Sequence, residues 1–277
     1  MPKGTTPHHD RSVRPVDLER AGAWLAHHGL PDDRPTPLLA TRLAARRGAR
    51  LAADVLLAAF IIAVSLIYTV HRPDGDAVDG PGPLRHWSLL IPTAVVAGLV
   101  LAQSLLDRRV RQADRRAAAT LPRRAAHPVR LGWRTVLGGP RAAFAVVTFA
   151  GATALAIHAL TVQDSTARYA AALLLIGLGG LAAGMLVQLR HVLERPVVAD
   201  DASSLTADVT LRVEDARHVA TPSVVWCLPT VSVLATGLGW WTVAWIAFVA
   251  LSVIALALIT ARTAPSSTVA QHVMSAR

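Results

Sequence analysis

The chain contains several stretches of seventeen or more residues without a single Asp, Glu, Lys or Arg. A soluble fold mixes polar and apolar residues at a spacing of about two to four positions, because each element keeps one face in water. Uncharged runs of this length instead match helices that cross the roughly 30 Å hydrocarbon core of a bilayer. The pattern predicts an all-α integral membrane protein.

We predict a bundle of six transmembrane helices with short outer loops and helical cytoplasmic segments. The expected spans are about 52–70, 88–106, 143–162, 169–188, 222–238 and 241–260. The last two are separated because a single helix over 222–260 would be nearly 60 Å long, about twice the bilayer core. Gly237, Gly239 and the Trp240–Trp241 pair predict a tight turn between them.

The distribution of basic residues predicts the orientation. With the N-terminus in the cytoplasm, that side holds segment 1–51, the loops 107–142 and 189–221, and the tail 261–277. These segments carry 25 of the 28 Lys and Arg residues. Because basic residues in short loops stay on the cytoplasmic side, we expect a multi-pass plasma-membrane protein with both termini in the cytoplasm.

Aromatic residues provide an independent indication of the span boundaries. Five of them fall at predicted outer ends of spans: Tyr68, Trp87, Tyr169, Trp240 and Trp241. Amphipathic aromatic rings favour the headgroup layer of a bilayer. Their positions therefore favour the boundaries given above.

Two amphipathic helices are expected in the N-terminal segment 1–51. The first covers 16–28 and stops at Gly29, and the second covers 36–50 with Thr36 as its cap. The second helix has arginines at helical spacing: Arg42, Arg46, Arg47 and Arg50. Such a helix suits an anionic bilayer surface, and an equally good interpretation is that the arginines act only as a topology signal.

The two long cytoplasmic loops differ in charge. Loop 107–142 is strongly basic and is expected to continue the second span as a helix. Loop 189–221 is rich in carboxylates: Glu194, Asp200, Asp201, Asp208, Glu214 and Asp215. The loops could dock on one another, but separate solvation of each charge is the favoured interpretation, because exposed ion pairs contribute little.

Few side chains in the predicted spans are of types that catalyse reactions or bind ligands. Asp54 and Asp107 lie at the cytoplasmic ends of predicted spans. His158 lies within a predicted span, near its outer end, and its favoured role is hydrogen bonding at the membrane interface. Gly180 and Gly184 predict a close helix contact in the fourth span. The sequence contains no GxSxG, HExxH, P-loop or Rossmann motif. We therefore expect no enzyme activity, no catalytic, cofactor-binding or metal-binding residues, and no cofactor.

The composition indicates what kind of organism encodes the chain and what kind of partner its charge attracts. All basic residues except Lys3 are Arg and the chain has no Asn, which is typical of a GC-rich bacterial genome. The net charge of +10 is explained by contacts with anionic lipid headgroups at the cytoplasmic face, and no nucleic-acid motif accompanies it.

Six spans, internal termini, an amphipathic entry helix and substantial cytoplasmic loops resemble the permease subunits of bacterial ABC exporters. The resemblance is one of topology over the whole chain. It implies a transport-type subunit that works with a separate cytoplasmic ATPase or other protein partner, because this chain has no ATP-binding loop. The alternative is a membrane scaffold or regulator that transports nothing and holds a partner on its cytoplasmic loops.

Overall fold

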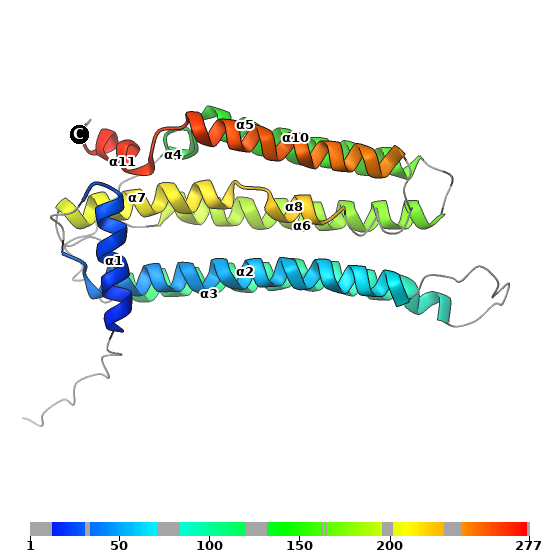
Figure 1. Ribbon diagram of the computed structural model, residues 1–277, viewed down its shortest axis with the longest axis horizontal. Coiled ribbons are helices and arrows are strands. Elements are labelled where there is room, and N and C mark those ends of the chain that lie inside the picture. The colour runs from blue at the N-terminus through cyan, green and yellow to red at the C-terminus, as the bar shows by residue number, and fades with distance from the viewer. Residues whose placement is uncertain are drawn as a thin grey trace, which may run out of the picture.

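The computed structural model describes residues 13–30, 34–70, 84–119, 132–161, 163, 165–195, 202–229 and 240–275. Throughout this part of the chain the regular structure is helical, which confirms the all-α class. Long helices run side by side along one axis, and most of the shorter helices gather at one end of the bundle (Figure 1).

Four helices are long and apolar enough to cross a bilayer. They are α2 (Pro37–Val70), α5 (Gly139–Leu160), α6 (Ser165–Glu194) and α10 (Trp240–Arg262). They contain the first, third, fourth and sixth predicted spans. Large apolar side chains point outward from them, including Val55, which is 68% exposed, and Ile176, which is 72% exposed. Exposed apolar surface on helices of this length fits a multi-pass membrane protein.

The second and fifth predicted spans are not shown as spans. Helix α3 (Leu84–Ala119) covers the second, but the side chains of 84–92 lie outside the description. In the fifth, the described helix is the short α8 (Ser223–Cys227), and residues 230–239, including most of the predicted turn, also lie outside it. Six spans therefore stay a prediction.

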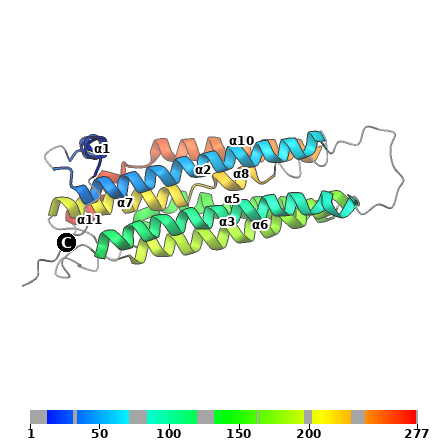
Figure 2. The same cartoon turned by 90° about the horizontal axis from the view of Figure 1, so that it is seen from below.

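The helices of the bundle pack in neighbouring pairs. Helix α2 packs along α3, α5 packs along α6 and also contacts α10, and α3 contacts α6 (Figure 2). The remaining helices are α1 (Pro15–His27), α4 (Trp133–Leu137), α7 (Ala202–Val219) and α11 (Ser266–Ser275). All four lie at the same end of the bundle, which we call the capped end (Figure 1).

The N-terminal helices form as predicted, with one correction. Helix α1 stops before Gly29, whose φ of 72° favours glycine, and the backbone N–H of Leu39 donates to Thr36 Oγ1 at 3.2 Å. The second helix does not end near residue 50, because α2 continues without a break to Val70. Arg42 and Arg46 do not lie on a lipid surface either, since they are 2% and 5% exposed.

An apolar core joins the long helices away from the capped end. Phe60, Leu99, Leu178 and Trp245 are among its buried members. Trp241 belongs to it as well, at 7% exposed, so its ring packs inside the bundle, and its depth in the headgroup layer stays a prediction. The ring of Trp241 packs edge-on against that of Trp245.

The other predicted interfacial aromatics divide into two groups. The Tyr169 hydroxyl hydrogen-bonds the Thr93 hydroxyl and thereby joins α6 to α3. The side chains of Tyr68, Trp87 and Trp240 lie outside the described part.

Small residues let α6 approach α3 closely, but not at both predicted glycines. A Cβ added at Gly180 would lie 3.1 Å from Val100 Cγ1, and one at Gly177 would lie 3.2 Å from Val96 Cγ1. A Cβ at Gly184 would meet nothing within 4 Å. The close contact therefore involves Gly177 and Gly180, and Gly184 faces open space.

Candidate functional site

Seven charged side chains are buried together at the capped end, and we call them the ion-pair network. Its members are Arg42, Arg46, Asp114, Arg195, Asp208, Arg212 and Asp215, each at most 9% exposed. Helix α2 supplies the first two, α3 supplies Asp114, the residue after α6 is Arg195, and α7 supplies the last three. The network thus connects α7 with the ends of three long helices.

Asp208 on α7 is the most deeply buried carboxylate of the network. Arg42 Nη2 donates to its Oδ1 at 2.5 Å, and Arg212 Nε donates to its Oδ2 at 2.9 Å. Burial alone would raise the pKa of Asp208, but the three nearby arginines, with Arg42 foremost, hold that pKa below its ordinary value. The carboxylate is therefore ionised at neutral pH.

Asp114 and Asp215 share the remaining guanidinium groups. Arg195 Nη1 donates to Asp114 Oδ2 at 2.5 Å, and Arg46 Nη2 donates to Asp114 Oδ1 at 3.0 Å. Arg46 also binds Asp215 with two nitrogens, Nε and Nη2, both at 2.8 Å from a carboxylate oxygen. Burial opposes ionisation of Asp114, and Arg195, Arg46 and Arg42 overcome it, so its pKa is lowered.

These contacts correct the interpretation of the two long loops as separately solvated. Asp114 comes from the basic loop, and Asp208 and Asp215 come from the acidic one, yet all three are buried in ion pairs. Several of their partners belong to α2, far away in the sequence. Helical spacing on α2 revealed a basic face, but it carried no signal for what covers that face.

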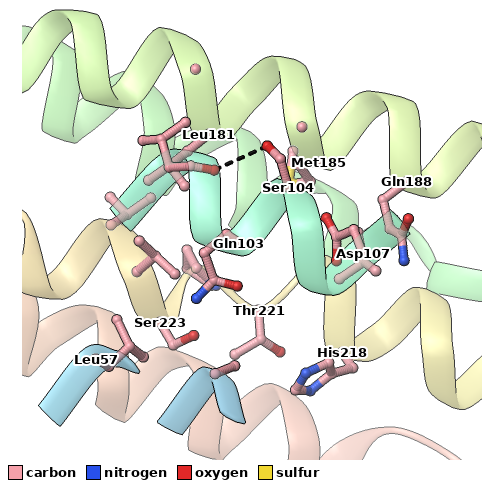
Figure 3. Close-up of a pocket in the computed structure, with 18 of the residues that line it drawn as sticks. Leu57, Gln103, Ser104, Asp107, Leu181, Met185, Gln188, His218, Thr221 and Ser223 are labelled. Carbon is pink, nitrogen blue, oxygen red and sulfur yellow. Dashed lines mark hydrogen bonds between the residues drawn. The ribbon is translucent and has the colours of Figure 1, made fainter. Parts of the chain in front are cut away.

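A pocket of about 160 Å³ lies beside the network, between α2, α3, α6 and the α7–α8 segment. Its polar lining includes Asp54, Gln103, Ser104, Asp107, Gln188, His218, Thr221 and Ser223. Figure 3 shows several of these side chains around the hollow, with Leu57 and Leu181 among the apolar walls. A second hollow shares Gln103, Asp107 and Gln188 with the pocket and extends to Arg46 and Asp114. The second hollow thus lies between the pocket and the network.

Asp107 is the most unusual group in the pocket. Burial raises its pKa, and Arg111 offsets only part of this effect. Arg111 Nη1 donates instead to Gln188 Oε1 at 2.6 Å, and within the described residues the Asp107 carboxylate accepts no hydrogen bond. A carboxylate kept half-buried without a full partner is a candidate for binding a ligand or a proton. Asp54, predicted at the end of another span, lines the same pocket.

The remaining residues singled out by sequence lie elsewhere. His158 is exposed, with its ring 6.2 Å from that of Trp241, and it does not line the pocket. Among the residues that the structure describes, no group of three or more His, Cys, Asp or Glu is placed to hold a metal ion. The arrangement suits a small polar or amphiphilic ligand, since amide, hydroxyl and carboxylate groups face apolar walls.

Searches of protein-family models, of curated proteins and of solved structures found no match to this chain. The fold and the site alone therefore define its class, a helical protein of the multi-pass membrane type with a charged cap.

Proposed function

We propose that the chain is a transport-type subunit of a bacterial plasma membrane, similar in organisation to the permease subunits of ABC exporters. It crosses the membrane six times with both termini in the cytoplasm, has no enzyme activity, and works with a separate cytoplasmic ATPase. The single observation that carries the proposal is a polar pocket in an apolar bundle, next to a second hollow that borders the buried network at the capped end.

The course of the chain supports an even number of crossings. Helix α6 runs toward the capped end, and α10 begins at the opposite end and returns (Figure 1). Between these two helices, α7 leads away from the capped end and α8 follows it along the bundle (Figure 1). Helix α1 and the C-terminal α11 both lie at the capped end, which the excess of basic residues assigns to the cytoplasm.

The pocket supports a transport role because polar groups next to an apolar bundle are costly unless they serve a function. The region between the spans is otherwise packed with apolar side chains such as Leu178 and Trp245. Gln103, Asp107 and Gln188 face a hollow near the cytoplasmic ends of the spans. Arg111 donates to Gln188, but a polar group there without such a partner is costly unless water or a ligand satisfies it. A pocket that adjoins the capped end could receive a ligand from the cytoplasm.

The ion-pair network supports coupling to a partner. Buried charge pairs join α7 directly to α2 and to Arg195 after α6, and the same arginines pair with Asp114 of α3. A protein that pushes on α7 would therefore move three long helices together. Trp133 of α4 is 47% exposed beside α7 and offers a contact surface for that protein.

Purification from cells that express the protein at native level tests the proposal. We expect an ATPase to copurify, and its ATP hydrolysis to depend on this chain. Trp133→Ala should reduce the stimulated hydrolysis at least severalfold, whereas Arg190→Gln, a change on an exposed side chain of α6, should not. A partner that contains no ATPase would overturn the proposal.

That last result would favour the alternative, a membrane scaffold or regulator. One observation supports this alternative: each network aspartate is fixed by two or more arginines, which makes the capped end a rigid platform. A scaffold retains its partner but shows no nucleotide hydrolysis that depends on the chain.

A further inference from the structure

A third hollow lies at the capped end, on the side of α2 where α1 crosses it. It has a volume of about 330 Å³ and is walled by α1, α2 and α7. Trp24 contributes from α1, Leu211 from α7, and Arg47 and Arg50 from α2. We call it the α1 groove.

Most of the charges in the α1 groove are already paired. Glu214 accepts a hydrogen bond from Trp24 Nε1 at 3.4 Å and contacts His28 Nε2 at 2.9 Å. Arg20 pairs with Asp17 at 3.6 Å, and Arg46 belongs to the ion-pair network.

Two guanidinium groups remain available in the groove. Arg47 and Arg50 are exposed, and within the described residues neither makes an ion pair or a side-chain hydrogen bond. They stand three positions apart on one helix and so share a face. Four arginines and three carboxylates, Asp54 among them, line the groove, which gives its described lining an excess of one positive charge.

Apolar surface begins where these arginines end. Leu51 is 56% exposed and Val55 is 68% exposed, and both lie on α2 directly after Arg50. From there to its end at Val70, α2 is mostly apolar and carries no charged residue other than Asp54. A cationic hollow thus borders the surface that would face lipid chains.

We propose that the α1 groove binds the headgroup phosphate of an anionic phospholipid, with Arg47 and Arg50 as its ligands and the acyl chains along Leu51 and Val55. Guanidinium groups bind phosphate oxygens through charge-assisted hydrogen bonds. The single negative charge of the lipid balances the excess charge of the groove. The inference depends on the membrane location of the chain and not on transport or on an ATPase.

Native mass spectrometry of the purified protein tests this site, with phosphatidylglycerol and phosphatidylcholine offered in equal amounts in detergent. We expect the wild type to retain phosphatidylglycerol in preference. The affinity of the double variant Arg47→Gln/Arg50→Gln for phosphatidylglycerol should be lower by about tenfold or more. The control Arg115→Gln/Arg116→Gln removes two exposed charges from α3 and should retain the lipid.

Each other result contradicts the site. An equal loss in both double variants would mean that general surface charge attracts the lipid. Equal retention of both lipids by the wild type would remove the role of the arginines. Inorganic phosphate that displaces the lipid at micromolar concentration would indicate a site for free anions. The thermal midpoint of both variants should match the wild type, because all four arginines are exposed.

Discussion

The ion-pair network and the apolar core hold the same helices together by different physics. At the capped end, α2, α3 and α6 meet through buried charges, whereas further along they meet through side chains such as Phe60, Leu99 and Leu178. Within a bilayer the lipid is as apolar as the core, so contacts there depend on close fit. At the capped end, each buried charge is stable only with its partners in place. The network is therefore the more specific of the two and the more easily broken.

The largest effect should follow from removing one network carboxylate. Asp208→Asn leaves Arg42 and Arg212 buried without their main partner, and should lower the free energy of unfolding by about 3–5 kcal/mol. Glu194→Gln breaks an exposed pair with Arg190 and should cost at most about 0.5 kcal/mol. Denaturation in detergent by heat or denaturant measures both. Equal losses would mean that the network contributes no more than a surface pair.

Acid should weaken the network in a predictable direction. The pKa values of Asp114 and Asp208 are lowered in the folded protein, so their stabilisation is complete above their unfolded value near 3.8. It is lost as the pH falls through the lower folded values, by up to about 1.4 kcal/mol per pH unit for each carboxylate. The thermal unfolding midpoint, measured between pH 6 and pH 3, should therefore decrease once the pH is below about 4. The decrease should be less steep in Asp208→Asn. Parallel curves for the two proteins would contradict this assignment.

Overpacking tests the apolar half of the comparison. Gly180→Leu forces side-chain atoms into Val100 and should cost about 1–3 kcal/mol. Gly184→Leu extends into the pocket, where a Cβ meets no atom within 4 Å, and should be nearly neutral. Thermal midpoints in detergent distinguish the two. A larger loss at Gly184 would mean that the close contact has been assigned to the wrong glycine.

The sequence could predict what depends on local pattern. Uncharged runs predicted four helices that the structure contains, Thr36 predicted the start of α2, and Gly29 predicted the end of α1. Each of these signals lies within a few residues of the feature that it predicts.

The candidate site could not be predicted in this way, because its parts meet only after the chain has folded. Arg42 and Asp208 are 166 positions apart, and neither residue type nor spacing marks them as partners. Asp54 and Asp107 were found at the ends of spans, yet their shared pocket depends on how α2 packs on α3 and α6. The glycine spacing likewise revealed a tight helix face but not which of its members touches α3.

The unbroken course of α2 has a mechanical consequence. From Pro37 to Val70 it is a single rod of about 50 Å, and its first turns are clamped by Arg42 and Arg46. Phe60, further along α2, is packed in the apolar core, so a rigid tilt of about 5° at the clamp would displace the far end of α2 by about 4 Å and move that packing with it. A continuous helix absorbs little of this movement, because bending it would strain its own backbone hydrogen bonds. Small movements of the charged side chains at the capped end would thus produce larger displacements of α2 at the opposite end of the bundle.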